Sequence, residues 1–255
     1  MGRIIAVANQ KGGVGKTTTV INLSASLAEA GRHVLVADMD PQGNTSSGLS
    51  IGKDRLSASI YDVLLGEKQA SEVLAADQLP NLDILPANVD LSGAEVELIG
   101  LENNAFLLRD VLSGMREDYD FILIDCPPSL NLLTVNALTA ADSVLVPIQC
   151  EYYALEGLSQ LLHTVSLIRE RLNEGLYIEG IVFTMYDART KLSQQVVENV
   201  KANLQQNIYE TIIPRNIRLA EAPSYGLPIN IYDTHSTGAE SYRALAKEVM
   251  AFQPG

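Results

Sequence analysis

Residues 10–18 carry the stretch that decides the fold, Gln10-Lys11-Gly12-Gly13-Val14-Gly15-Lys16-Thr17-Thr18. An apolar run at residues 3–8 precedes it and predicts a buried strand. The residues that follow place apolar side chains at helical spacing as far as Gly31, which is typical of the position after a helix. A glycine-rich loop between a strand and a helix is the arrangement that a phosphate-binding loop requires.

The residue types in this loop suit an anion. Glycines let successive backbone N–H groups point inward, and the following helix adds its positive N-terminal end. Lys16 can reach the β- and γ-phosphates of a nucleotide, and the Thr17 hydroxyl can ligate Mg²⁺. The alternative is a glycine-rich turn without a ligand, which the Gly-Lys-Thr offset between the two elements disfavours.

Two further predicted strands end in carboxylates. Residues 33–37 form an apolar run that leads into Asp38 and Asp40, and a second run at 121–124 ends in Asp125. In open α/β sheets, the carboxyl ends of parallel strands face the ligand crevice. We therefore expect Asp40 to orient a water near the γ-phosphate, Asp38 to support the Mg²⁺ shell through water, and Asp125 to ligate Mg²⁺ or orient Thr17. Acidic turn residues without such roles are the alternative.

The rest of the chain alternates expected strands and helices. Strands are predicted at 82–86, 143–148, 178–185 and 208–213, and helices at 92–112, 154–172 and 238–251. The apolar stripe expected to be buried on the helix at 154–172 begins at Leu155. This pattern predicts an α/β fold with a doubly wound, mostly parallel sheet and helices on both faces. The absence of an internal repeat or a low-complexity linker favours a single domain over residues 1–255.

Composition limits the function classes. The formal net charge is −13, so any contact with DNA must come from a local basic patch. The two cysteines, Cys126 and Cys150, cannot build a disulfide framework and are expected to be buried apolar residues. No signal-peptide pattern and no apolar run of membrane-spanning length occurs, so we expect a cytoplasmic protein with no membrane partner.

The loop departs from the standard phosphate-binding pattern because Gln10 replaces the first glycine and Lys11 adds a second lysine. This deviant Walker A form resembles the ParA/MinD group of P-loop ATPases. Strings at 40–44, 125–129, 149–157, 187–190 and 213–223 are similar to the chromosomal ParA/Soj branch of that group. The resemblance implies DNA segregation, in which ATP drives a sandwich homodimer that binds double-stranded DNA without sequence preference. It also implies slow hydrolysis stimulated by a ParB-type centromere-binding partner, and association with the nucleoid.

The resemblance assigns roles to individual residues. Lys11 would reach the nucleotide of the other subunit, and Pro214 and Asn216 would contact the adenine. The implied catalytic residues are Lys11, Lys16, Asp40 and Asp125, and the implied Mg²⁺ residues are Thr17, Asp38 and Asp125. The implied ATP-binding residues are Lys11, Gly12, Gly13, Val14, Gly15, Lys16, Thr17, Thr18, Pro214, Arg215 and Asn216.

Cations in two successive loops are the candidates for DNA contact. Arg189 and Arg218 match DNA-contacting positions of the family, with Lys191 and Arg215 nearby in the sequence. Phosphate contacts need only such cations at the right spacing, and a dimer would double their number. The alternatives are that the arginines pair with Asp187, Glu210 or Glu221, and that Arg215 faces the nucleotide.

Three other functions remain open from the sequence. A MinD-like membrane-cycling ATPase would need a basic amphipathic helix at its C-terminus, and residues 249–255 contain no basic side chain. A nucleotide-gated iron–sulfur carrier or reductase would need cysteine ligands, and neither Cys126 nor Cys150 resembles one. A scaffold that binds ATP with negligible hydrolysis is the third.

Overall fold

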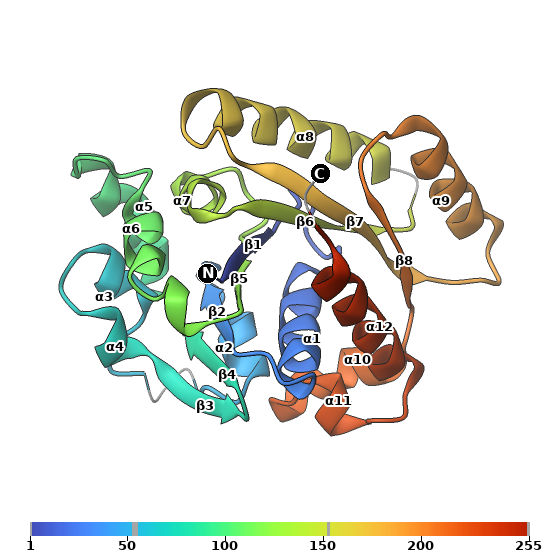
Figure 1. Cartoon of the computed structure of the whole chain (residues 1–255), viewed down its shortest axis with the longest axis horizontal. Helices are drawn as coiled ribbons and strands as arrows, with labels where there is room; N and C mark the ends of the chain where they lie inside the picture. Colours follow the sequence, from blue (N-terminus) through green and yellow to red (C-terminus); the bar gives the residue numbers. More distant parts are fainter. Residues whose placement is uncertain (1, 53–55, 152–153, 254–255) are drawn as a thin grey trace.

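The computed structural model describes residues 2–52, 56–151 and 154–253, and the strands within them form one sheet (Figure 1). The strand order is β3-β4-β2-β5-β1-β6-β7-β8. All neighbouring strands are parallel except β3 and β4 at one edge. The strands are β1 Arg3–Val7, β2 Val34–Asp38, β3 Ala75–Leu79, β4 Leu82–Leu85, β5 Phe121–Asp125, β6 Ser143–Gln149, β7 Tyr177–Tyr186 and β8 Ile208–Pro214. The expected fold class, a doubly wound and mostly parallel sheet, is confirmed.

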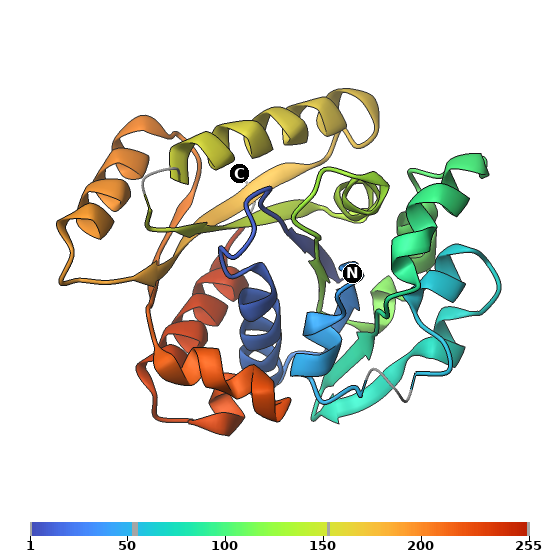
Figure 2. The same cartoon turned by 180° about the vertical axis from the view of Figure 1, so that it is seen from behind.

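Helices cover both faces of the sheet. Figures 1 and 2 place α7 and α8 on one face and α1 and α12 on the other. The α-helices are α1 Lys16–Glu29, α2 Asn44–Gly48, α3 Ile60–Leu64, α4 Ala70–Val73, α5 Leu91–Glu97, α6 Leu107–Ser113, α7 Leu132–Ala140, α8 Ala154–Arg171, α9 Lys191–Asn203, α10 Ile217–Glu221, α11 Ile229–Tyr232 and α12 Thr237–Ala251. Short 3₁₀ helices are η2 Leu98–Gly100, η3 Arg116–Asp118 and η4 Ala222–Tyr225. Within the described ranges, no helix has the length and apolar content needed to cross a bilayer.

The core lies in two apolar layers, one on each face of the sheet. Strands β2 and β5 are buried along their whole length because both of their faces are covered, as their continuous Val, Leu and Ile content predicts. One layer contains Leu91, Leu133 and Leu161 from the helices of one face. The other contains Leu23 of α1 and Tyr242 of α12. The central strands are therefore packed on both faces.

The site lies where the strand order reverses. Strand β1 pairs with β5 on one side and β6 on the other, so the connections leaving β1 and β5 diverge from the same point. Val7 and Asp38 both pair in register with Asp125, which brings the ends of β1, β2 and β5 together. The phosphate-binding loop begins directly after Val7.

Three details differ from the sequence-based prediction. The expected helix at 92–112 is broken between η2 and α6, where Asn103 has a φ of 56° that a right-handed helix cannot accommodate. Leu155 on α8 is 39% exposed and does not join the buried stripe. The edge strand β3 was not predicted, because Ala76 and Asp77 in its middle are exposed and the five residues lack a continuous apolar run; Asp77 also has a φ of 54°.

Candidate functional site

The phosphate-binding loop is shaped by two glycines and anchored to the neighbouring strands β6 and β7 by two side-chain hydrogen bonds. Gly13 and Gly15 have φ values of 74° and 91°, a region that favours glycine, and Gly15 precedes the first residue of α1. No side chain caps this helix start, so its first N–H groups remain available for an anion. Thr184 Oγ1 donates to Val14 O at 2.8 Å, and Asn9 Nδ2 donates to Pro147 O at 2.8 Å.

Lys16 points into the loop that precedes it. The residue is buried, and Nζ donates to the carbonyl oxygen of Lys11 at 3.2 Å. Burial lowers the pKa of Lys16, while the nearby charges of Asp125 and Asp40 oppose that shift. A phosphate group placed in the loop would stabilise the charged ammonium.

Asp125 provides a carboxylate oxygen that has room for a further ligand. Its Oδ2 accepts hydrogen bonds from Thr17 Oγ1 at 2.8 Å and Thr45 Oγ1 at 2.6 Å. Its Oδ1 is buried and accepts no hydrogen bond from any residue in the described ranges. Burial and the nearby charge of Asp38 raise the pKa of Asp125. A buried carboxylate with a free oxygen beside a threonine hydroxyl fits Mg²⁺ or a water bound to it.

Asp38 and Asp40 have different environments. Asp38 is fully buried, and its oxygens accept from the backbone N–H of Asp40 at 3.1 Å and from Ser46 N and Oγ at 2.9 and 2.7 Å. It therefore fixes the start of α2, and a role in the Mg²⁺ shell is restricted to contact through water. Asp40 lines the cavity over the loop, with Oδ1 accepting from Gln42 N at 2.9 Å. That position suits a group that orients a water.

Two adjoining cavities meet at the loop. The first, of about 290 Å³, is lined by Gly12, Gly13, Gly15, Lys16, Thr17, Thr18, Asp40, Asn44, Pro128 and Met185. The second, of about 410 Å³, is mainly apolar and is lined by Gly15, Thr18, Thr184, Met185, Ile213, Pro214, Arg215, Asn216, Ile217, Leu219, Ala220 and Tyr242. A polar cavity at a phosphate loop joined to an apolar one has the form of a nucleotide site. The structure thus brings the residues predicted at 214–216 to the residues predicted at 12–18.

The wall between these cavities has an unusual backbone. Met185 lines both cavities with a φ of 52°, which is rare for a long side chain. Asn216 caps α10, because its Oδ1 accepts from Arg218 N and Leu219 N, and its Nδ2 donates to Thr237 Oγ1 at 2.8 Å. Its amide oxygen is therefore engaged within the protein, and so is the backbone N–H of Arg215, which donates to Tyr186 O at 2.9 Å.

Lys11 does not point into its own loop. Its Nζ pairs with Glu151 Oε2 at 3.0 Å, and both side chains are partly exposed. Gln149 Nε2 donates to the other carboxylate oxygen of Glu151 at 2.6 Å. The lysine thus lies at the rim of the site, held by a partner that solvent can reach.

The candidate DNA-contacting arginines are exposed and paired. Arg189, whose side chain is 87% exposed, donates to both oxygens of Asp187 at 2.9 and 2.8 Å, and this lowers the pKa of Asp187 to about 2. Arg218 pairs with Glu221 at 3.0 Å and with Asp233 at 3.5 Å. The alternative pairings with Asp187 and Glu221 therefore occur. Arg215 lines the larger cavity.

Sequence reasoning missed several residues that organise the site. Thr45 and Ser46 hold Asp125 and Asp38, and Thr184 holds the phosphate loop from β7. The sequence could have indicated Thr45 and Ser46, because hydroxyl side chains that directly follow a carboxylate motif at the end of a strand can hydrogen-bond back to those carboxylates. No local pattern pointed to Thr184, because its contact with Val14 spans 170 positions.

Comparison with known proteins gives full-length matches. A family profile described as an AAA domain matches residues 2–178. The chain is 56% identical over 250 residues to the chromosome partitioning protein ParA of Myxococcus xanthus, covering 98% of this chain and 88% of that protein. It is 55% identical over 251 residues to the sporulation initiation inhibitor protein Soj of Bacillus subtilis, covering 98% and 99%.

A solved structure supports the form of the site. Cobyrinic acid a,c-diamide synthase from Mycobacterium smegmatis, with bound ATP analog and magnesium, matches with a TM-score of 0.86 and 39% identity. The match covers 98% of this chain and 95% of that one. That protein shares the fold and holds an ATP analog with magnesium. The relative from Myxococcus xanthus, which has a higher identity, is named for chromosome partitioning.

Proposed function

Because this chain belongs to the ParA/Soj family of chromosome-partitioning ATPases, we propose that it is a nucleotide switch for DNA segregation. In this proposal, residues 1–255 act as one domain that binds ATP with Mg²⁺, dimerises, binds double-stranded DNA without sequence preference, and is reset by slow hydrolysis. The observation that carries the proposal is the pair of joined cavities, which places Lys16, Thr17 and Asp40 around the space next to the phosphate loop.

The residues divide the chemistry of hydrolysis among them. Lys16 and the N–H groups of the loop neutralise the phosphates. Thr17 and Asp125 would hold Mg²⁺, and the ion would supply positive charge next to the phosphate oxygens. Asp40 orients the attacking water and accepts its proton. Turnover is slow until a ParB-type partner fixes that water in place, as expected when a catalytic arrangement forms only on docking.

Dimerisation requires Lys11 to change partners. The ion pair with Glu151 is partly exposed, and such pairs contribute only about 0–1 kcal/mol. A nucleotide bound in the partner subunit carries more negative charge than one carboxylate does. ATP therefore draws Lys11 across the interface and closes the dimer.

Binding to DNA likewise requires exposed ion pairs to be exchanged for contacts with phosphates. The ion pairs of Arg189 and Arg218 are exposed, so DNA phosphates can replace the carboxylates at low cost. Lys191 at the start of α9 and Arg215 directly after β8 add further cations at the same edge of the sheet. Since one subunit offers few cations, the dimer is the form that binds, at the nucleoid.

Sedimentation velocity tests the switch. Asp40→Ala, which retains nucleotide, is expected to sediment as a dimer in ATP and as a monomer in ADP, without ATP turnover. The double variant Lys11→Ala with Asp40→Ala is expected to bind ATP and remain a monomer, whereas a matched change of the exposed Lys68 to Ala leaves the dimer intact. An ATP-dependent dimer that lacks Lys11, or normal turnover without Asp40, would refute these assignments.

A further inference from the structure

The segment from residue 89 to residue 99, which includes helix α5 and the start of η2, carries covered and uncovered apolar side chains. Leu91, Ala94 and Leu98 are fully buried in the core layer that also contains α7. Val89, Val96 and Ile99 are 73%, 77% and 68% exposed. Their spacing of seven and three residues places them on one face of the helix and its flanking turns. Three large apolar side chains aligned and exposed in this way are typical of a contact surface rather than of scattered surface residues. We call them the α5 stripe.

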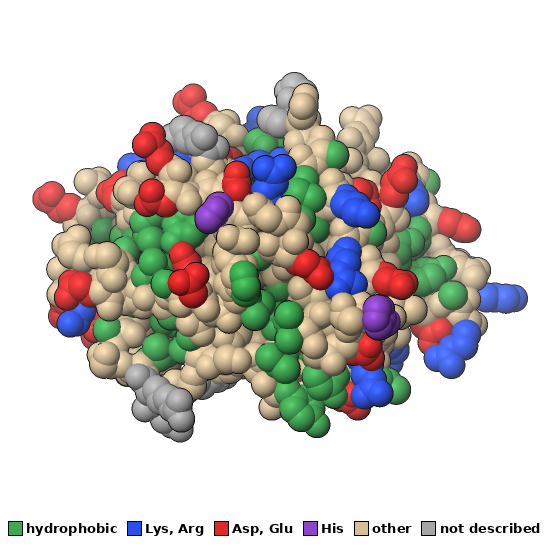
Figure 3. Space-filling model, turned by 60° about the horizontal axis from the view of Figure 1, so that its bottom comes forward, with side chains coloured by type: hydrophobic (Ala, Val, Ile, Leu, Met, Phe, Trp, Pro, Cys, Tyr) green, Lys and Arg blue, Asp and Glu red, His purple; other side chains and the backbone are tan. Residues whose placement is uncertain are grey.

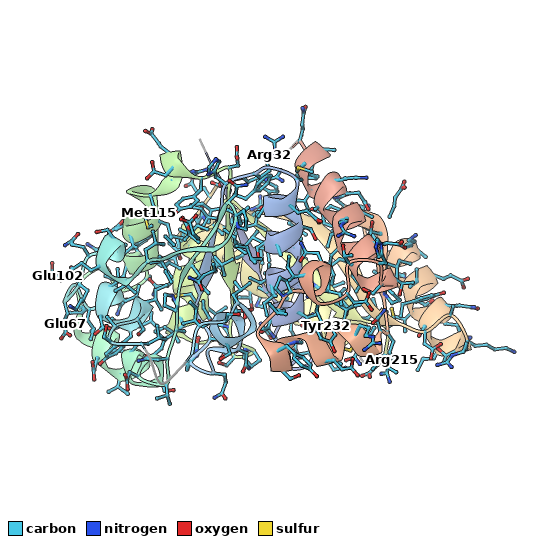
Figure 4. All side chains as sticks on the ribbon, turned by 90° about the horizontal axis from the view of Figure 1, so that it is seen from below. Arg32, Glu67, Glu102, Met115, Arg215 and Tyr232 are labelled. Carbon is cyan, nitrogen blue, oxygen red and sulfur yellow. The ribbon has the colours of Figure 1, made fainter. Side chains whose placement is uncertain are left out.

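The surroundings of the α5 stripe are acidic. Residues 69–108 contain seven Asp and Glu and no Lys or Arg. The exposed Asp90, Glu97 and Glu102 flank the stripe in the sequence. Figure 4 places Glu67 and Glu102 at one end of the molecule and Arg215 at the other. In Figure 3, apolar side chains are exposed between carboxylates on the left, where α3 to α6 lie in Figure 1.

This charge distribution indicates which kind of molecule can bind to the α5 stripe. DNA is disfavoured because the charged residues that flank the stripe in the sequence, Asp90, Glu97 and Glu102, are carboxylates that repel its phosphates. A second copy placed by two-fold symmetry would bring Asp90, Glu97 and Glu102 of both chains together, which is repulsive. An apolar stripe between carboxylates is complementary to an amphipathic segment that carries Lys or Arg beside its apolar side chains.

We propose that the α5 stripe is a docking surface for a basic amphipathic segment of a partner protein. The stripe is closely connected to the nucleotide site. Ala87, two residues before Val89, donates its N–H to Ser46 Oγ at 3.0 Å, and that hydroxyl donates to Asp38 at 2.7 Å. The other exposed apolar group, which includes Ile217, Tyr225 and Ile231, differs because the carboxylates beside it, Glu221 and Asp233, are both paired with Arg218. The source of the segment rests on the proposed function, in which a partner protein stimulates hydrolysis.

The test uses a synthetic helical peptide of leucine, alanine and lysine, with leucines along one face, and a scrambled peptide of the same composition. Fluorescence anisotropy without nucleotide measures binding, so the result is independent of ATP-driven dimerisation. The wild-type chain is expected to bind the amphipathic peptide saturably and in preference to the scrambled one. The double variant V96S/I99S is expected to bind the amphipathic peptide at least about tenfold more weakly than the wild-type chain does. The matched variant I231S is expected to bind like wild type.

Three results would overturn the proposal. The first is equal binding of both peptides, which would show that net charge alone attracts them. The second is unchanged binding by V96S/I99S, provided that circular dichroism shows the variant folded. The third is a loss of self-association in V96S/I99S during sedimentation in ATP, which would identify a second copy of this chain as the occupant.

Discussion

The affinity for Mg²⁺ and nucleotide is expected to rise with pH because Asp125 must be ionised to hold the metal. Burial and the charge of Asp38 raise the pKa of Asp125 to about 7. At pH 6 about a tenth of the ligand-free protein then has Asp125 ionised, and at pH 8 about nine tenths. Since the binding-competent fraction scales the apparent affinity, binding should strengthen about tenfold between these values.

Titration of a fluorescent ATP analogue in saturating Mg²⁺, at pH 6, 7 and 8, measures this effect. The nucleotide also titrates near neutral pH, so Asp125→Asn is the control that keeps the nucleotide's own contribution and removes that of the side chain. We expect a steeper pH dependence in the wild-type chain than in the variant, and uptake of Mg²⁺ and nucleotide near pH 7 should release a proton. Equal slopes in the two proteins would refute the assignment of Asp125 to the metal.

Three further outcomes are expected. Without nucleotide, the raised pKa values of Asp125 and Asp38 stabilise the folded chain below about pH 4, and this contribution is lost as pH rises towards 7. Urea unfolding should therefore show a free energy of unfolding that falls from pH 4 to pH 7, by at most about 1.4 kcal/mol per pH unit for each group. A free energy of unfolding that rises over this range would contradict the assignment. Lys16→Ala should abolish ATP binding in the same fluorescence titration, and retained affinity would show that the loop does not use this ammonium. Gly180→Ala would place its Cβ 2.5 Å from the ring of buried Tyr209 and should cost about 1–3 kcal/mol in thermal unfolding, whereas Gly100→Ala, with open space around it, should be nearly neutral.

The sequence predicted the elements whose signals are local. The loop at 10–18, the buried strands and the carboxylates at their ends follow from short patterns, and the structure places Lys16, Thr17 and Asp125 together. Periodicity could not show that Leu155 is exposed, because an apolar stripe predicts which face of a helix is covered but not how far along the helix the cover extends. The edge strand β3 has one neighbour and a polar side, so its composition is close to that of a loop.

Contacts between distant segments were beyond sequence reasoning. The pairing of Lys11 with Glu151 and the anchoring of Val14 by Thr184 join residues that are 140 and 170 positions apart. Their partners are set by strand order and register, which no single segment encodes. The same holds for the capping role of Asn216, where the amide satisfies backbone groups of α10.

The central claim is that ATP controls contact with DNA, and co-sedimentation with non-specific double-stranded DNA tests it most directly. The Asp40→Ala variant, held in the ATP state, is expected to bind DNA in ATP but not in ADP, and to lose binding steeply as salt rises. Arg189→Glu and Arg218→Glu in that background should each weaken binding while leaving the ATP-dependent dimer intact. A dimer that forms in ATP and shows no DNA binding at low salt would contradict the account.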